Sequence, residues 1–274
     1  MTQNMPTETS HRLIDSLANP AIVDLPDDEQ AYLVELVCIL RDYLADQLVG
    51  VYLFGSAAYG EYRKGVSDLD IQVVVSDPLV TRQCLDLANL LSHSFLPCPA
   101  KKLDFVVYLI NQVQPVSDHV NHEFRFTTGD QEQNNLVFEN SPDGRHWYLL
   151  DIGIGRLRGV SLYGPEAEEI FTEIPQQWVL SALNHAMCWH SINEPCSANF
   201  VLNLCRTWRF IKTGDWVTKR EGGNWAYAIS PHQELIRDAL AASEFGNCFD
   251  PELVKALADD VAKAFDDKIV PMPI

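Results

Sequence analysis

The stretch from Leu53 to Ile71 combines a small-residue turn with a pair of acids in otherwise apolar surroundings. Residues 49–54 are apolar and rich in strand formers, so they predict a buried strand that Gly55 and Ser56 end in a tight turn. A helix that begins at such a turn presents its free backbone N–H groups and the positive end of its dipole beyond the strand. This end of the predicted strand therefore suits a phosphate group.

A pair of acids follows at Asp68 and Asp70, where the next apolar run begins. Residues 68–75 predict a second strand, and alternation along it places the two carboxylates on one face, with their Cα atoms about 7 Å apart. Carboxylates at that spacing can converge on a hard cation such as Mg2+, which takes oxygen ligands and leaves positions for substrate phosphates. The pair therefore indicates a divalent-cation site beside the turn.

A third predicted strand, residues 103–109, carries Asp104 near its beginning. If this strand pairs beside the second, Asp104 joins Asp68 and Asp70 at one edge of the sheet. Three acids in one place repel one another unless cations are present, so the cluster is hard to explain as plain structure. An isolated Asp-x-Asp is usually only a solvated turn, but a Gly-Ser turn followed by acids on two strands favours a nucleotidyltransferase site.

These motifs carry a family resemblance. Gly55-Ser56, Asp68-x-Asp70 and Asp104 resemble the catalytic half of the DNA polymerase β-like nucleotidyltransferase superfamily. The second half of the chain is similar to the helical domain of aminoglycoside nucleotidyltransferases of the streptomycin/spectinomycin 3''/9 adenylyltransferase type. Four segments carry that similarity, namely residues 201–208, Gly214, residues 217–219 and residues 221–226. The resemblance covers about residues 35–250.

The resemblance implies an α+β fold with two domains. A nucleotidyltransferase domain on a mixed β-sheet is expected at residues 1–145, and an α-helical bundle that binds substrate and nucleotide at residues 146–274. The implied activity is Mg2+-dependent transfer of AMP from ATP to a hydroxyl of an aminoglycoside or aminocyclitol antibiotic, spectinomycin or streptomycin, which confers resistance. Two open alternatives are a transferase of the same fold that acts on a non-antibiotic small molecule or on a protein or RNA acceptor, and a nucleotide-binding pseudoenzyme.

In the first half, the resemblance assigns the nucleotide-binding positions and the metal ligands. Gly55, Ser56 and Ser67 match the residues that bind the triphosphate. Asp68 and Asp70 match the ligands of two Mg2+ ions that accompany ATP. The resulting expectation is a site that requires both the nucleotide and a divalent cation.

Asp104 matches the catalytic base of the family. The family commonly has Glu at this position, and Asp is one methylene shorter, so a role as a metal ligand stays open. Arg206 and Lys219 match basic residues that the helical domain brings to the nucleotide phosphates. A planar guanidinium suits phosphate oxygens through paired hydrogen bonds, and a lysine adds a point charge.

The candidates for contacts with the acceptor are Asp151, Glu194 and Asn199. Streptomycin-modifying members carry a Trp and acidic residues just ahead of the helix that holds Arg206. Residues 191–197 of this chain offer only Glu194 there, which favours spectinomycin or a non-antibiotic hydroxyl compound. Asp151 is also the nearest candidate for an Asp that contacts the nucleotide, whereas Trp147 stands at the ungapped position.

The net charge of −18 and the pI of about 4.7 argue against binding a nucleic-acid backbone, which needs a basic footprint. An acidic surface instead attracts a cationic small molecule such as an aminoglycoside. The seven cysteines include no Cys-x-x-Cys pair, which fits reduced thiols and no zinc site. With neither a signal peptide nor a membrane span in the pattern, we expect a cytoplasmic monomer with no membrane partner.

The remaining periodicity predicts the other elements. Apolar residues at helical spacing predict a helix at 29–48, and residues 81–95 are expected to form the helix that crosses between the second and third strands. An alternating run predicts a strand at 123–128, followed by a loop or boundary at 129–144. Four helices are expected in the second half, at residues 175–191, 199–213, 231–242 and 251–265.

Overall fold

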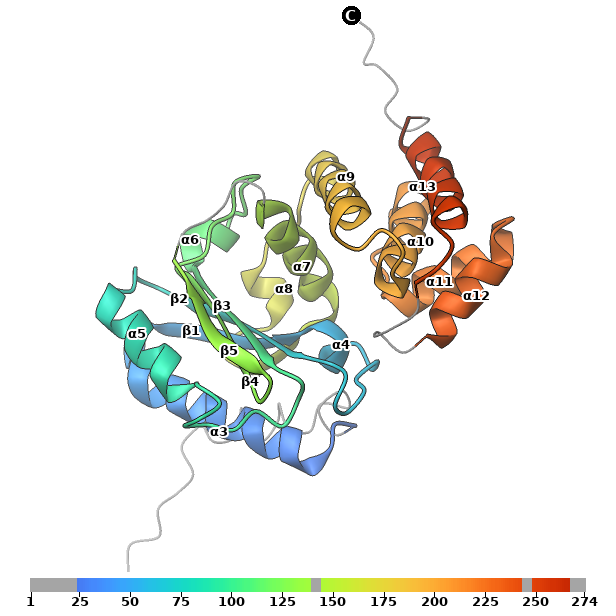
Figure 1. The fold of residues 1–274 in the computed structure, drawn as a ribbon. Helices are drawn as coiled ribbons and strands as arrows, with labels where there is room; N and C mark the ends of the chain where they lie inside the picture. The colour runs from blue at the N-terminus through green and yellow to red at the C-terminus, as the bar shows by residue number, and fades with distance from the viewer. Residues whose placement is uncertain (1–23, 139–143, 243–247, 267–274) are drawn as a thin grey trace, which may run out of the picture. The chain divides into compact units, whose positions relative to one another are not determined.

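The computed structural model describes residues 24–138, 144–242 and 248–266, and the chain divides into two compact units, Met1–Ile174 and Pro175–Ile274 (Figure 1). The division falls later than the expected domain boundary between residues 145 and 146. The reason is that residues 145–174 contain a helix and a strand that complete the first unit rather than beginning the helical one.

The first unit is built on a six-stranded mixed sheet with the order β5-β4-β3-β2-β1-β6. Strands β2 and β3 are parallel, and every other neighbouring pair is antiparallel. The strands are β1 (Leu48–Phe54), β2 (Leu69–Val75), β3 (Leu103–Leu109), β4 (Phe124–Gly129), β5 (Glu132–Val137) and β6 (Val160–Tyr163). The strands expected at 49–54, 68–75, 103–109 and 123–128 are confirmed within one residue at each end.

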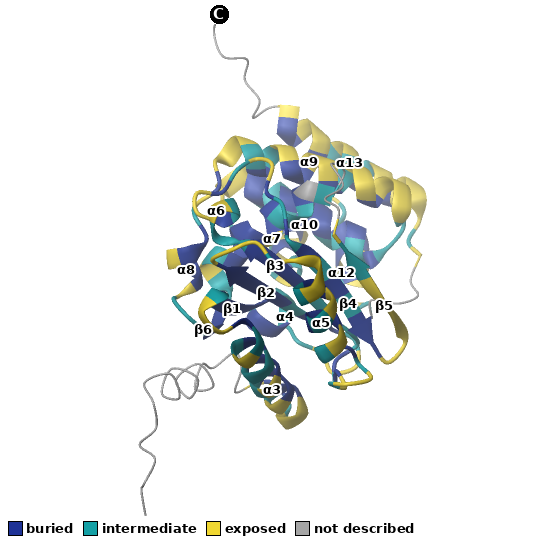
Figure 2. Cartoon of the chain, turned by 90° about the vertical axis from the view of Figure 1, so that its left-hand side faces the viewer, coloured by how far each residue is buried: buried dark blue, intermediate teal, exposed yellow. Residues whose placement is uncertain are grey.

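Two helices cover one face of this sheet, α3 (Asp27–Leu44) and α5 (Thr81–Leu90). The buried stripe of α3, visible in Figure 2, includes Leu33, Leu36 and Leu40, which join the odd-numbered residues of β2 and β3 in one core. Burial of a leucine of this kind stabilises the fold by roughly 1.5–3 kcal/mol. Both helices were predicted, α3 from its apolar periodicity and α5 as the crossing between two strands. Helix α3 ends four residues early, where a 3-10 turn, Ala45–Gln47, leads into β1, and α5 ends five residues early.

The other face of the sheet lies beneath α7 (Arg145–Arg158) and α8 (Ala167–Ile170) (Figure 1). Tyr52 and Phe54 of β1 point to this face, and their ring centroids lie 5.1 and 5.3 Å from that of Phe171. A Cβ on Gly155 of α7 would overlap with the ring of Phe54, so α7 can approach β1 because glycine stands there. The even-numbered residues of β2 and β3 share this face, and they include Asp70 and Asp104.

Two further strands differ from the expectation. Residues 129–144 were predicted as a loop, which is wrong for residues 132–137, because they form the edge strand β5. The side chains from Glu132 to Asn135 are all exposed, so this strand lacks the alternation that marks a half-buried one. Strand β6 consists of four residues and pairs with β1 at the opposite edge.

The second unit is a helical bundle around α10 (Ala198–Thr213). The helices α9 (Gln176–Asn193), α11 (Lys219–Ile229), α12 (Gln233–Ala241) and α13 (Pro251–Asp266) all pack against it. The expected helices at 175–191, 199–213, 231–242 and 251–265 are confirmed, whereas α11 was not predicted. In the described ranges, no helix is long and apolar enough to cross a membrane.

Local sequence signals set the ends of α10 and α11. The hydroxyl of Ser197 accepts a hydrogen bond from the Phe200 N–H at 3.0 Å, which caps the start of α10, and Gly214 ends the helix in the left-handed conformation (φ 79°). Helix α11 begins with a capping box, in which Thr218 and Glu221 each accept the backbone N–H of the other residue. These caps define the ends of α10 and α11, the helices that carry Arg206 and Lys219.

Candidate active site

The turn after β1 is shaped around an aspartate. Gly55 has φ +65°, and a Cβ at this position would overlap with Oδ2 of Asp70. Only glycine allows both this backbone conformation and the close approach of the Asp70 carboxylate. Ser56 follows in the single helical turn α4 (Gly55–Ala58) and is half-buried. The turn and the acid predicted to act together therefore lie side by side.

The strand register brings the predicted acids to one place. Phe54 pairs with Asp70 across β1 and β2, and Asp70 pairs with Asp104 across β2 and β3. Asp68 lies two residues before Asp70, just ahead of β2. The expectation that Asp104 joins Asp68 and Asp70 at one edge of the sheet is confirmed by this register.

Of the three acids, Asp70 lies where a negative charge is least favourable. Burial, followed by the negative charges of Asp104, Asp151 and Asp68, raises the pKa of Asp70 to about 8, and Lys102 opposes the shift only weakly. At neutral pH the metal-free protein therefore favours a proton on this carboxylate. A cation bound here would displace that proton.

Asp68 is half-buried and only partly neutralised. Its Oδ2 lies 3.4 Å from Nζ of Lys102, and its Oδ1 lies 4.0 Å from Nζ of Lys101. Oδ1 is buried and accepts no hydrogen bond from the described residues. Burial raises the pKa of Asp68, and the two lysines oppose that shift. An oxygen left in this way has unused capacity for a further cation.

Asp104 differs because the protein itself neutralises it. Arg125 donates from Nε to Oδ1 at 2.9 Å and from Nη2 to Oδ2 at 2.8 Å, and Nζ of Lys102 lies 3.4 Å from Oδ2. Burial alone would raise the pKa of Asp104, but the hydrogen bonds and charges of Arg125 and Lys102 hold it below its usual value. Asp104 therefore stays a carboxylate.

The donor set fits a divalent cation held by two carboxylates together with substrate oxygens. Across the described parts of the chain, no three Asp, Glu, His or Cys side chains converge to hold a metal by themselves. Asp68 has a buried oxygen without a hydrogen bond, and Asp70 lies in the cradle left by Gly55, where its negative form is disfavoured until a cation compensates it. Phosphate oxygens would complete the coordination, as Mg2+ sites that bind nucleotides commonly do.

Ser67 and Asp151 were both predicted as site residues. Ser67 is buried, and its Oγ accepts the Arg63 N–H at 3.0 Å, so it closes the turn that leads into β2. Asp151 is exposed on α7, and its negative charge raises the pKa values of Asp70 and Tyr108. Asp151 therefore belongs to the acidic surroundings of Asp70, although only a weak match in the sequence indicated it.

In the second unit, Arg206 of α10 and Lys219 of α11 stand near each other. A Cβ on Gly222 would lie 2.5 Å from Cα of Arg206, so α11 crosses α10 closely at this point. Both cations oppose protonation of His190 and lower its pKa, after burial, which is the larger cause. The two residues therefore form a positive region within the helical unit. Their contact with the nucleotide stays a prediction.

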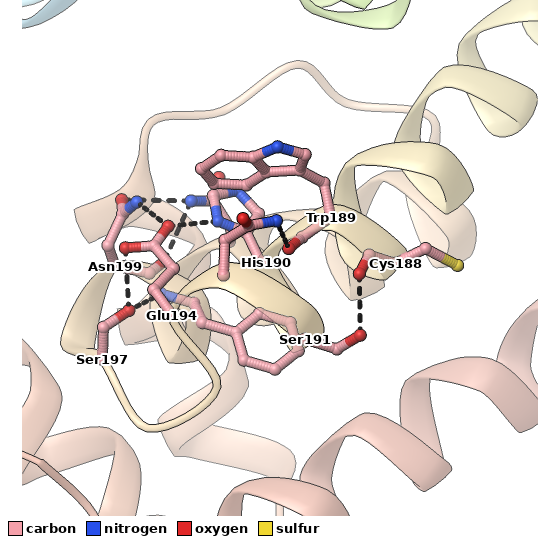
Figure 3. A network of polar contacts seen from close by, with 10 residues as sticks. Cys188, Trp189, His190, Ser191, Glu194, Ser197 and Asn199 are labelled. Atoms are coloured by element: carbon pink, nitrogen blue, oxygen red, sulfur yellow. Dashed lines mark hydrogen bonds and ion pairs between the residues drawn. The ribbon is translucent and has the colours of Figure 1, made fainter. Parts of the chain in front are cut away.

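Glu194 and Asn199 lie in a polar network between α9 and α10 (Figure 3). Asn199 Nδ2 donates to Glu194 Oε1 at 2.7 Å, Ser197 Oγ donates to Oε2 at 3.2 Å, and the buried His190 ring contacts Oε1 through Nδ1. Asn203 Nδ2 donates to Asn199 Oδ1 at 3.1 Å. These contacts hold the connection between the two helices. A role in acceptor binding for Glu194 and Asn199 stays a prediction.

Sequence reasoning missed Arg125 and Lys102, the two cations inside the acid cluster. The sequence did predict that residues 123–128 form a strand, so the position of Arg125 within a strand could have been recognised. Arg125 pairs with Val106, which shares its face of β3 with Asp104. What the sequence did not indicate is that β4 pairs beside β3, which brings the guanidinium to the acid.

Comparison with known proteins agrees with this site. The polymerase β nucleotidyltransferase family model matches residues 36–123, and the model of the C-terminal domain of aminoglycoside adenylyltransferases matches residues 169–264. An aminoglycoside (3'')(9) adenylyltransferase of Klebsiella pneumoniae is 30% identical over 223 residues, which are 77% of this chain and 83% of the relative. A spectinomycin 9-adenylyltransferase of Staphylococcus aureus is 26% identical over 227 residues, 79% of this chain and 85% of the relative.

A solved structure shares the fold. The spectinomycin adenyltransferase AAD(9) of Enterococcus faecalis, crystallised with ATP and spectinomycin, superposes with a TM-score of 0.62 at 23% identity, over 86% of this chain and 99% of that chain. The α+β fold and the family resemblance expected from the motifs are thereby confirmed. On this evidence, the chain belongs to the aminoglycoside adenylyltransferase family of nucleotidyltransferases.

Proposed function

We propose that this protein transfers AMP from ATP to a hydroxyl of an aminocyclitol or aminoglycoside antibiotic, with spectinomycin as the first candidate, and thereby confers resistance. The observation that carries the proposal is the approach of Asp70 to the Gly55 turn, which places a carboxyl group suited to a cation beside a turn suited to a phosphate. The names of the relatives support the acceptor class. The single acid in residues 191–197 favours spectinomycin over streptomycin.

We assign the predicted site residues of the first unit the following parts in this reaction. Gly55, Ser56 and Ser67 hold the triphosphate beside the end of β1. Asp68 and Asp70 hold the divalent cation, Mg2+ in the cell, with two ions expected when ATP is present. When bound, the cation neutralises the phosphate charge that develops during transfer.

Asp104 takes the proton from the acceptor hydroxyl as its oxygen attacks the α-phosphorus and pyrophosphate leaves. A carboxylate oxygen has more than one lone pair, so Asp104 can accept from a hydroxyl while it remains bound to Arg125. Arg206 and Lys219 of the helical unit bind the nucleotide phosphates. The candidates for contacts with the cationic acceptor are Asp151 of the first unit and Glu194 and Asn199 of the helical unit. We propose that the protein performs this reaction in the cytoplasm as a monomer.

The experiment is to incubate the protein with ATP, Mg2+ and a panel of aminocyclitols and aminoglycosides, and to record masses and pyrophosphate release. We expect an acceptor with one added AMP, formed from spectinomycin. The matched control is Asp70→Asn, which should form no product. No adduct with any member would reject the antibiotic acceptor, and AMP found on a protein or an RNA would support the alternative acceptor class.

A further inference from the structure

The carboxylate of Asp104 is fixed from one side by a single arginine. Both oxygens of Asp104 accept hydrogen bonds from Arg125, at 2.9 Å from Nε to Oδ1 and 2.8 Å from Nη2 to Oδ2. Such a paired contact sets both the position and the plane of a carboxylate, which a single-point contact cannot do. The Asp104 side chain is 18% exposed, so this contact with Arg125 is largely shielded from water.

The sheet aims Arg125 at this carboxylate. β4 runs antiparallel to β3, and Arg125 pairs with Val106. Asp104 lies two residues before Val106, on the same face of β3. The arginine side chain therefore reaches diagonally across the strand pair to the acid. Burial alone would lower the pKa of Arg125, but Asp104 and, less strongly, Asp151 of α7 favour its charged form. Both residues of the pair thus lie within neighbouring strands, and their contact does not depend on a loop.

The same contact separates Asp104 from the two other acids. Asp68 and Asp70 have no such fork on their oxygens in the described residues, and Asp68 keeps a buried oxygen without a hydrogen bond. Asp104 pairs directly with Asp70 in the strand register, so an unrestrained side chain there could turn towards a cation that Asp68 and Asp70 hold. The fork holds it towards β4 instead.

We propose that Arg125 is a positioning residue for the transfer reaction: it holds the Asp104 carboxylate towards the acceptor hydroxyl and keeps it from serving as a third metal ligand. This inference rests on the proposed function for its catalytic part. Its structural part concerns the orientation of Asp104 and the effect of that orientation on the affinity for a divalent cation, neither of which requires AMP transfer.

The test uses the full chain and four variants, Arg125→Met, Arg125→Lys, Asp104→Asn and the double variant of Asp104→Asn with Arg125→Met. Arg125→Lys keeps the charge and removes the fork. The double variant removes both charges, so no uncompensated buried carboxylate is left if Arg125→Met alone unfolds. Thermal unfolding of every variant shows which are folded.

In the transfer assay, Arg125→Met and Arg125→Lys should each lower kcat by about 100-fold and leave the KM for ATP within about threefold. The double variant should be no slower than Asp104→Asn alone, because Arg125 acts through Asp104. Full activity of Arg125→Lys, or a loss in the double variant that multiplies the two single losses, would overturn the proposal.

In a second measurement without nucleotide, Mn2+ binding is followed by electron paramagnetic resonance. Arg125→Met should bind Mn2+ about tenfold more tightly than the wild type, because Asp104 is released towards the cation, and the gain should vanish in the Asp104→Asn background. A gain that persists there would show a general charge effect and reject the proposal. Because this readout needs no acceptor, absence of AMP transfer in the wild type would reject the proposed function and leave this inference testable.

Discussion

Nζ of Lys102 lies 3.4 Å from Asp68 Oδ2, and at the same distance from Asp104 Oδ2, so one ammonium spans the first predicted metal ligand and the predicted base. The lysine is largely buried. Burial alone would lower the pKa of Lys102, but Asp104 and Asp68 raise it above its usual value. In the metal-free protein, Lys102 therefore supplies part of the positive charge that the acid cluster needs.

Replacement of Lys102 by Met should strengthen Mn2+ binding in the absence of ATP by about tenfold, because the cation no longer competes with an ammonium for Asp68. Titration of Mn2+ into both proteins measures the change. Lys64→Met is the matched control, since it removes the same charge from an exposed lysine that pairs with Asp28. Equal affinities in Lys102→Met and the wild type would contradict this account.

Replacement of Asp70 by Asn should abolish AMP transfer and leave the protein folded. The opposite face of β2 carries the core residues Ile71 and Val73, which the change does not touch. At neutral pH, removal of a carboxylate whose pKa is raised to about 8 should also increase the stability of the metal-free protein. Urea unfolding and the transfer assay check both parts. Substantial turnover would reject the metal-binding role of Asp70.

Replacement of Gly55 by Ala should lower the free energy of unfolding by more than backbone strain alone would. The new methyl group would overlap with the Asp70 carboxylate at a position where φ is +65°. We expect a loss of about 2–4 kcal/mol in the free energy of unfolding, together with weaker Mn2+ binding. Gly60→Ala is the control, because Gly60 has φ +75° and an added Cβ there would have no atom within 4 Å. Similar losses in both variants would show that strain alone explains the effect.

His122 should make the protein less stable in mild acid. Burial, helped by the charge of Arg125, lowers the pKa of His122 from 6.5 to about 4. Below about pH 6.5 the unfolded chain takes up a proton that the folded protein excludes, so stability falls as the pH drops towards 4 and does not change on this account above 6.5. Between about pH 7.5 and pH 5 the contribution is about 2 kcal/mol.

Replacement of His122 by Phe should remove that part of the pH dependence, which urea unfolding at the two pH values measures. His119→Gln serves as the control, since the side chain of His119 is 72% exposed. If the free energy of unfolding falls equally with pH in His122→Phe and in the wild type, another group causes the acid sensitivity.

Replacement of Arg206 or Lys219 by Ala should weaken ATP binding by roughly 1.5–3 kcal/mol, the scale of a lost charge-assisted contact. Titration calorimetry measures the affinity. Lys212→Ala, on an exposed position of the same helix as Arg206, is the matched control and should bind ATP as the wild type does. Unchanged binding in both test variants would mean that the positive region of the helical unit serves another ligand.

The sequence was informative where local patterns determine structure. Apolar runs with turn residues predicted the four central strands, and the spacing of Asp68 and Asp70 predicted that they share a face. The pairing of β3 with β4, and hence the contact of Arg125 with Asp104, depends on tertiary arrangement that periodicity does not encode. Helix α11 was missed for a local reason, because Gly222 and Gly223 lower helix propensity, yet both are buried where α11 packs on its neighbours.

The pairing of β6 with β1 has a consequence for how this chain can be divided. A fragment that ended at residue 145 would leave the backbone groups at that edge of β1 without a partner strand, and Phe54 without the helix and ring that cover it. Unpaired edges of this kind recruit other chains and promote aggregation. A fragment that ends at Ile174 keeps both edge strands, so the nucleotidyltransferase unit should be expressible by itself only in that longer form.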